Sequence, residues 1–508
     1  MNTSKSSFRR RLSTLDPLQI YALVIAGILF LLTASGDYME YLYEHFLPIP
    51  CTMFMTIMLI RGVPASAKKK YLLSIPMVLW FVFLQIKRSH DNADGYSAAL
   101  FLTGYLFAFP FASLIQDNDR NQGLKLFAGA ITAASVNLVL HTALLVLDRI
   151  PESMAKEVYW DGARLHVFWH PNISSCIFLI CTAFTLAFLL DSKKKRIKPA
   201  LLFLLAAQFF ANSLTNCRTT ILLTCGLLGG SLFFAIVHRG LKWFLPALAA
   251  ALAVILLGFS FAGTIYDANQ NYLLAKYTAA YEAQQEATER EAAEKETTES
   301  GSFETSTETT GKDTDEKGKK DEKKEEPAEE LPIKVNKETG KITLKTTSPQ
   351  KSLEKDFRTL NGRTTIWKSA LYALRESPKL LIWGVDDPGV YISYYNPFKV
   401  GHAHNSWMEI LMGLGFPGLC MALLFTLIAL WNSAFILLKH HQNVWKQCCA
   451  LLVLCLLIAG FMEPYLFYTS PDYHLFDFTF FILLGYLCYW QEEDNRNLLR
   501  SIRNRLSR

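Results

Sequence analysis

Apolar stretches recur along both ends of the chain and are separated by short polar connections. Each is near the roughly 17–25 residues that a helix needs to cross a bilayer. The pattern predicts an all-α polytopic membrane protein with about twelve transmembrane helices, whose limits are read to within about 2–4 residues. The predicted spans are 18–35, 46–60, 71–86, 97–116, 124–147, 173–190, 199–213, 218–237, 244–263, 416–438, 447–462 and 474–490.

These spans divide the chain into four parts. An N-terminal bundle of about nine helices takes residues 1–263, and a long extracytoplasmic loop takes 264–415. C-terminal transmembrane helices follow over 416–490, and a basic cytoplasmic tail closes the chain at 491–508.

The basic residues predict which side each connection faces, because short cytoplasmic loops collect Lys and Arg. Connections with and without basic residues alternate along the whole chain. The one exception is the connection with Lys87 and Arg88, which is placed outside. We therefore expect both termini in the cytoplasm. The first span could instead be a cleaved signal peptide, since "TASGD" (33–37) resembles a cleavage site; we expect it to be retained. The basic groups assigned to the inside are Arg9–Arg11, Lys68–Lys70, Arg120 and Lys125, 192–198, Arg239 and Lys242, Lys439 and Lys446, and the tail.

Composition fits this class of protein, with 51% hydrophobic residues. The formal net charge of +6 belongs mostly to the cytoplasmic loops, where it meets anionic lipid, so no nucleic-acid partner is needed. The ten cysteines form no CxxC pair, and we expect them to be apolar packing residues rather than zinc ligands or disulfides.

The long loop contains two kinds of sequence. Residues 282–350 are rich in Glu, Lys and Thr and poor in large apolar residues, which predicts a disordered spacer or a fraying helix. Residues 357–415 are predicted to be ordered. Asn361 and Gly362 are a plausible N-cap, which puts Arg363 in the first turn of a helix that ends before Pro378. Arginine is unfavourable there unless an anion is bound at the helix start; the alternative is an ordinary exposed arginine.

Two further polar clusters fall on the predicted outer face. "ARLHVFWHPNISS" (163–175) contains Arg164, His170 and Asn172, and Arg218 begins a predicted span. A charge at membrane depth usually faces a protein interior or an aqueous cavity, although it can also reach lipid phosphate by snorkelling.

"VGHAHNSW" (400–407) adds His402, His404 and Asn405 to the same face. Arginines 164, 218 and 363 have no matching carboxylates nearby in sequence, so we expect them to form a site for a multiply charged anion. A histidine beside it can act as a base near neutral pH. Metal binding by the two histidines is a weaker alternative, because no Cys or Glu cluster completes a ligand set; we expect no metal and no cofactor.

Several of these motifs resemble the O-antigen ligase and O-antigen polymerase superfamily. "HAHNSWMEILMGLGFPGL" (402–419) is similar to its His–Asn signature, and "NGRTTIWKSAL" (361–371) to the Arg-plus-Trp helix of its long loop. "LTNCRTTILL" (214–223), with Cys217 at the usual serine, and "RLHVFWHPNISS" (164–175), with His170 at the first asparagine of an Asn-Pro-Asn element, are also similar. "SPKLLIWGVDDPGV" (377–390) resembles a Pro-x-x-Gly-x-Gly stretch, with Asp386 at the second glycine. The resemblance covers roughly residues 160–440, and the tract 282–350 departs from it.

The resemblance implies a membrane-embedded, metal-independent glycosyltransferase of cell-envelope polysaccharide synthesis. Its donor would be a glycan on undecaprenyl pyrophosphate, used on the outer face of the cytoplasmic membrane, and its acceptor a glycan or a lipid. Arg218 and Arg363 would hold the diphosphate, assisted by Arg164, and His404 would orient or deprotonate the acceptor hydroxyl. The substrate-binding residues would be Arg164, His170, Asn172, His402, Asn405 and Trp367.

Three functions remain open at this point. A ligase would transfer the glycan to a different lipid or envelope polymer, and a polymerase would join lipid-linked repeat units. We expect a ligase-like enzyme, with the polymerase as its alternative. A transporter or flippase of an anionic lipid or solute is the alternative from another class; no repeated halves are visible in the sequence to support it.

Overall fold

The computed structural model describes the second half of the predicted bundle, the start of the long loop and most of the residues from 362 to 488. The described residues are 76, 79, 80, 83, 84, 87, 122–151, 158–167, 171–300, 333–335, 342–344, 362–385, 387–396, 401–440, 443–464, 466, 476 and 479–488. This part is mostly helical, as expected. The spans 18–35, 46–60 and 97–116 lie outside it and 71–86 largely does, so the count of about twelve stays a prediction.

The later predicted spans coincide with apolar helices. Among the described residues, five helices are long and apolar enough to cross a membrane, which together with their composition indicates a membrane protein. These are α8 (Gln122–Val146), α9 (Pro171–Asp191), α11 (Arg218–Val237), α12 (Phe244–Ser300) and α17 (Ser406–Lys439). Shorter apolar helices are α10 (Lys198–Leu214), α18 (Val444–Gly460) and Thr479–Cys488.

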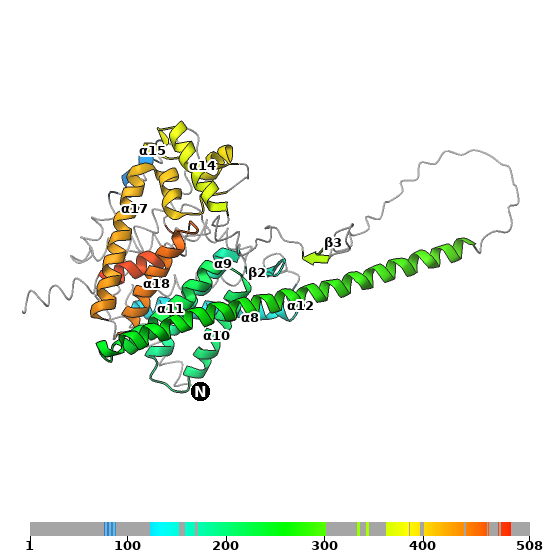
Figure 1. The fold of residues 1–508 in the computed structure, drawn as a ribbon, viewed down its shortest axis with the longest axis horizontal. Helices are drawn as coiled ribbons and strands as arrows, with labels where there is room; N and C mark the ends of the chain where they lie inside the picture. The colour runs from blue at the N-terminus through cyan, green and yellow to red at the C-terminus, as the bar shows by residue number, and fades with distance from the viewer. Residues whose placement is uncertain are drawn as a thin grey trace, which may run out of the picture. The chain divides into compact units, whose positions relative to one another are not determined.

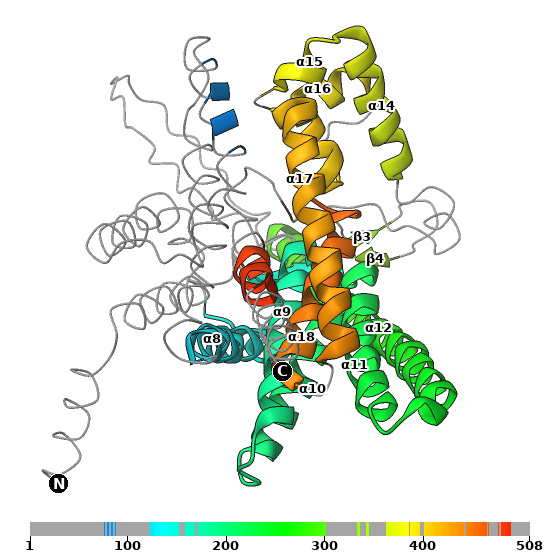
Figure 2. The ribbon, with the colours of Figure 1, turned by 90° about the vertical axis from the view of Figure 1, so that its left-hand side faces the viewer.

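Helix α9 forms the centre of this bundle. It packs against α8, α10, α11 and α18 (Figure 2). Phe178 and Phe184 are fully buried, and the helix is buried on every side for most of its length. Such a helix is expected to be apolar all round, and its sequence is. Because α9 is fixed by four neighbours, its first turn is a rigid support for side chains at that end of the bundle.

Three short helices gather against the beginning of α17 (Figure 2). They are α14 (Arg363–Glu376), α15 (Leu380–Trp383) and α16 (Pro388–Tyr395). The predicted limits of α14 are confirmed, with Gly362 as N-cap at φ 79° and a C-cap directly before Pro378. A second apolar core joins these helices to α17 and includes Ile366, Ala370, Leu374, Ile392 and Met412.

Helix α17 begins ten residues earlier than the predicted span 416–438. Asn405 caps it by accepting a hydrogen bond from the Met408 amide at 2.9 Å, which starts the helix at Ser406. Gly415, at φ 69°, then interrupts the helical backbone before the membrane-spanning part continues. The expected boundary at 415 is therefore a break inside a longer element and not its start.

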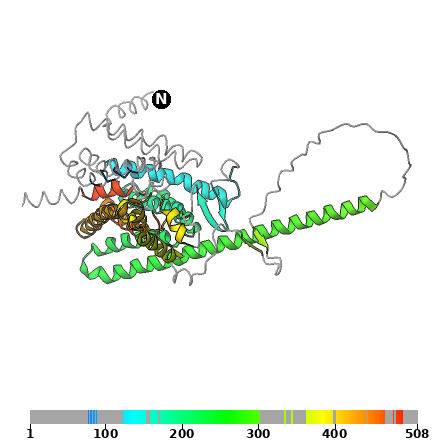
Figure 3. The same cartoon turned by 90° about the horizontal axis from the view of Figure 1, so that it is seen from above.

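Helix α12 also extends beyond its predicted span 244–263, and Figures 1 and 3 show it unbroken to Ser300. Of the two alternatives expected for 282–350, a disordered spacer or a fraying helix, residues 282–300 adopt the helix, since Glu, Ala, Gln and Arg are strong helix formers. Glu286 and Arg290 add an i,i+4 pair at 3.8 Å. Neither alternative included β3 (Ile333–Val335), which pairs antiparallel with β4 (Ile342–Leu344).

Residues 266–350 form a unit of their own together with residues 161–163. Within this unit, the Asn269 side-chain amide donates to the Ala163 carbonyl at 3.2 Å. Residues 161–163 include the turn between β1 (Val158–Asp161) and β2 (Arg164–Val167), a two-stranded sheet that precedes α9.

Candidate active site

Glu463 is the centre of a polar cluster just beyond the end of α18. Its carboxylate is buried, with 6% of the side chain exposed. Oε2 lies 2.8 Å from Nδ1 of His404, and Oε1 lies 2.5 Å from Nη2 of Arg363. The side-chain amide of Asn172 also donates to Oε1 at 2.8 Å. One carboxylate thus joins residues from α9, α14 and the turn before α17, which are far apart in the sequence.

The backbone around Glu463 is fixed against the beginning of α17. The Ser406 hydroxyl donates to the Glu463 carbonyl at 3.2 Å and accepts from the Leu466 amide at 3.0 Å. The Asn405 side-chain amide donates to the Phe461 carbonyl at 3.0 Å. Asn405 therefore uses its amide oxygen to cap α17 and its amide nitrogen to hold the segment that carries Glu463.

The charges around Glu463 set its protonation state. Burial by itself raises the pKa of the carboxyl, but the neighbouring charge and hydrogen bond of His404, with Arg363 and His402, outweigh burial and hold the pKa well below its usual range. The ionised carboxylate can only accept hydrogen bonds. Nδ1 of His404 must therefore carry the proton, and in the neutral ring the lone pair lies on Nε2.

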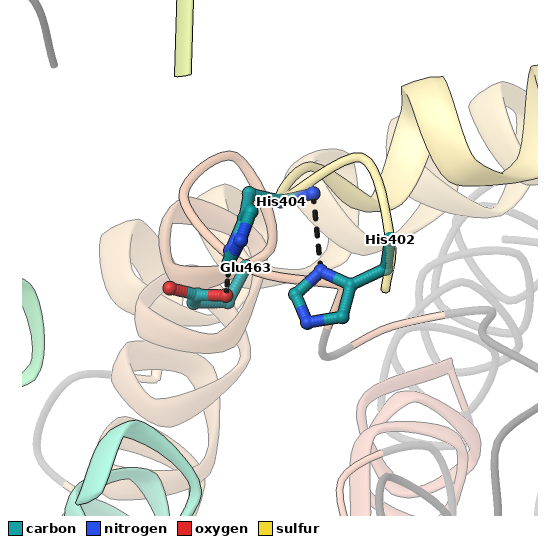
Figure 4. A group of neighbouring side chains, drawn as sticks. All are labelled: His402, His404 and Glu463. Carbon is teal, nitrogen blue, oxygen red and sulfur yellow. Dashed lines mark hydrogen bonds and ion pairs between the residues drawn. The ribbon is translucent and has the colours of Figure 1, made fainter. Parts of the chain in front are cut away.

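The turn that presents His404 is strained and held at several points. His404 has φ 50°, a left-handed conformation that is uncommon for a residue with a side chain. Its amide donates to Nδ1 of His402 at 3.3 Å, and Figure 4 shows both rings beside Glu463. The Trp367 indole donates to the Ala403 carbonyl at 3.0 Å, and the Ala403 amide donates to the Glu409 carboxylate at 2.6 Å. The surrounding contacts impose the strained backbone, as is common at functional sites.

Arg164 extends the cluster towards the turn between α10 and α11. Its Nη2 donates to the side-chain oxygen of Asn172 at 3.1 Å, and its Nε donates to the Thr215 carbonyl at 3.1 Å. Asn172, the second residue of α9, therefore lies between the guanidinium of Arg164 and the carboxylate of Glu463.

The turn itself leads directly to Arg218, the first residue of α11. The Thr215 hydroxyl donates to the Asn212 carbonyl at 2.7 Å and accepts from the Cys217 amide at 3.3 Å. Asn216, between them, has φ 51°. Arg218 is half-buried and follows by three residues the carbonyl that Arg164 binds.

The structure brings together most of the residues that the sequence singled out. Arg164, Asn172, Arg363, His402 and His404 lie in one cluster, while Trp367 and Asn405 hold its backbone. His170 lies outside the described residues. The catalytic and substrate-binding roles of all these residues stay predictions.

Glu463 itself was not predicted. Arg363 has no matching carboxylate nearby in sequence, but it has one in space: Glu463 is 100 positions away and its Oε1 lies 2.5 Å from Nη2 of Arg363. A signal was present, since Glu463 is an acidic residue directly after an apolar helix, on the face where the arginines were expected.

The geometry allows two kinds of chemistry. A histidine whose Nδ1 is held by a buried carboxylate can take a proton at Nε2. The second kind is metal binding. His402, His404 and Glu463 each offer one ligand atom, and these three atoms lie within 4.8 Å of one another.

Comparison with known proteins gives one finding that bears on function. Residues 200–423 match the O-antigen ligase family. The matched segment contains Arg218, Arg363, His402 and His404, whereas Arg164, Asn172 and Glu463 lie outside it. No curated protein matches the chain. Residues 200–423 are therefore similar to the O-antigen ligase family, as the sequence motifs suggested.

Proposed function

We propose that the protein transfers a glycan from undecaprenyl pyrophosphate to an acceptor hydroxyl on the outer face of the cytoplasmic membrane. The superfamily supports a ligase or polymerase acting on lipid-linked glycans. The observation that carries the proposal is the contact of 2.8 Å between His404 Nδ1 and the buried carboxylate of Glu463.

His404 acts as the general base. Its Nε2 takes the proton of the acceptor hydroxyl, and the acceptor oxygen forms a bond to the anomeric carbon of the donor. The bond between that carbon and the diphosphate oxygen breaks, and undecaprenyl pyrophosphate leaves with the bonding electrons. Glu463 holds the imidazole in the required tautomer and stabilises the imidazolium ion that forms.

The arginines balance the charge of the leaving group. Three guanidinium groups, those of Arg164, Arg218 and Arg363, carry +3, and the Glu463 carboxylate carries −1, which leaves +2 when the histidines are neutral. A diphosphate with two ester bonds carries about two negative charges. Nε of Arg363 is buried and has no hydrogen-bond partner among the described residues, so an incoming phosphate oxygen would satisfy it.

The test is transfer by purified full-length protein in detergent, with a lipid-linked glycan as donor. His404→Ala and Arg218→Ala should each lower the rate by about 10² or more, because a base and a charge-stabilising donor are each worth that much. Matched controls are His238→Ala and Arg239→Ala, which change exposed residues beyond the other end of α11. Normal rates in the His404 and Arg218 variants would refute the roles.

The arginines make a metal unnecessary for this reaction. We therefore expect that prolonged treatment with a chelator does not lower the transfer rate of the purified protein. A rate that falls on chelation and returns with an added divalent cation would show that the mechanism is wrong in this respect.

The acceptor decides between a ligase and a polymerase, and we propose the ligase. Surface glycans of a deletion strain distinguish the two by size. Full-length lipid-linked chains that never reach their final carrier indicate loss of a ligase, whereas single unextended units indicate loss of a polymerase. Uptake of a lipid or solute into vesicles without any new glycosidic product would instead support a transporter.

A further inference from the structure

Metal binding by His402 and His404 was the weaker alternative from the sequence, because no Cys or Glu cluster completed a ligand set. Glu463, 59 positions beyond His404, supplies the missing carboxylate. We propose that His402, His404 and Glu463 bind a divalent transition-metal ion of the zinc class, and that the bound ion inhibits the proposed transfer. The inhibition rests on the proposed function; the binding does not.

The distances are close to what such an ion needs. Zinc binds imidazole nitrogen and carboxylate oxygen at about 2.0–2.2 Å in a tetrahedral arrangement, so two ligand atoms on one ion are about 3.3–3.6 Å apart. His404 Nδ1 and Glu463 Oε2, at 2.8 Å, would have to separate by about 0.5–0.8 Å. The full set lies within 4.8 Å, so its widest pair would have to approach by up to about 1.2–1.5 Å. His402 can make this shift, because its contact with the His404 amide is long at 3.3 Å.

Hydrogen bonds orient the Glu463 carboxylate for metal binding. Arg363 and Asn172 both bind Oε1, while Oε2 is directed at His404. Hydrogen bonds from outside the ligand set that orient a ligating carboxylate are a regular feature of metal sites. Figure 4 shows the three side chains converging.

The donor atoms select the class of ion. Two imidazoles and one carboxylate suit zinc and neighbouring transition metals, whereas Mg²⁺ and Ca²⁺ prefer six or more oxygen ligands. Three protein ligands leave a fourth position for water or substrate. The positive charge of Arg363, 2.5 Å from the same carboxylate, further disfavours ions that bind by charge alone.

A bound ion would prevent His404 from acting as the general base. If the ion takes Nε2 of His404, the lone pair that accepts the proton is used. If it takes Nδ1, the neutral ring carries its proton on Nε2 and cannot accept another. The same three residues would therefore serve either proton transfer or metal binding, and the ion would compete with the reaction.

The experiment is calorimetric titration of chelator-treated, full-length protein in detergent with ZnCl₂, in the absence of any glycan. We expect one high-affinity ion per chain, no comparable binding of MgCl₂, and a loss of affinity of about tenfold or more in His402→Ala and Glu463→Gln. His238→Ala, an exposed histidine beyond the far end of α11, is the matched control and should keep the wild-type affinity.

Thermal unfolding provides a second measurement. Zinc should raise the Tm of the wild type and of His238→Ala, but not that of His402→Ala. If zinc also inhibits wild-type transfer at the concentrations that saturate the calorimetric site, both parts of the proposal hold. Affinity unchanged in His402→Ala and Glu463→Gln would overturn the site. Saturation without loss of transfer would overturn the inhibition, while an absence of transfer activity in zinc-free protein would count against the proposed function alone.

Discussion

At the scale of single residues, we expect substitution of Glu463 to have the largest effect on transfer rate and on stability. Glu463→Gln keeps the shape and some hydrogen bonds but leaves Arg363 without its counter-charge and allows the wrong tautomer of His404. We expect transfer to fall by about 10² or more and unfolding free energy to fall by about 3 kcal/mol. A transfer assay and thermal unfolding measure the two effects, with Glu376→Gln, exposed at the end of α14, as control. Equal behaviour of the two variants would contradict the central role of Glu463.

The same carboxylate predicts how stability depends on pH. The pKa of Glu463 is lower in the folded protein than the value of about 4.3 in an unfolded chain. Its contribution is therefore fully present above that value and is lost as pH falls towards the folded pKa. Below about pH 4.5 the Tm of the wild type should fall more steeply than that of Glu463→Gln, and near neutral pH this group should add no pH dependence. Parallel curves for both proteins across the acid range would count against the lowered pKa.

At the scale of elements, the break in α17 brings the beginning of that helix under α15. Gly415 has φ 69°, and a Cβ there would lie 2.3 Å from the Ile382 carbonyl oxygen. Gly415→Ala should therefore displace α15 or straighten α17 and lower both transfer and Tm, with at least about 1–2 kcal/mol of backbone strain. Gly226→Ala is the matched control, because nothing lies within 4 Å of its added Cβ inside α11. It should be neutral or stabilise by up to about 1 kcal/mol. Tolerance of Ala at 415 would show that the break is not required.

The elements also show what the sequence could predict and what it could not. Apolar runs and caps are local signals, so the four spans from 124 to 237 and the start of α14 at Arg363 were predicted closely. The extended ends of α12 and α17 were missed because polar helix formers and an asparagine cap continue a helix beyond its apolar part. Glu463 was missed for a different reason: its partners are 59 to 291 positions away, and only packing reveals such a distance.

At the scale of the whole molecule, several membrane helices each contribute one end to the site. Contacts of Asn172, Thr215, Asn405 and Phe461 place the starts of α9, α11 and α17 and the end of α18 around Glu463. The far ends of these helices are joined by connections rich in Lys and Arg, at 192–198 and 238–243 and at Lys439. Because basic connections stay in the cytoplasm, this arrangement predicts that the site faces outward.

Cysteine labelling with a membrane-impermeant maleimide tests that orientation. Arg290, near the end of α12, has 81% of its side chain exposed, and Lys194 lies in the exposed connection between α9 and α10. Arg290→Cys should be labelled in intact cells, because the basic residues before Phe244 predict that α12 crosses outward from its start. Lys194→Cys should be labelled only after the membrane is opened. Most native cysteines in the described part of the chain are buried, so the unsubstituted protein gives the background. Labelling of Lys194→Cys in intact cells, with Arg290→Cys protected, would place Glu463 and its arginines on the cytoplasmic face, where a donor presented outside could not reach them.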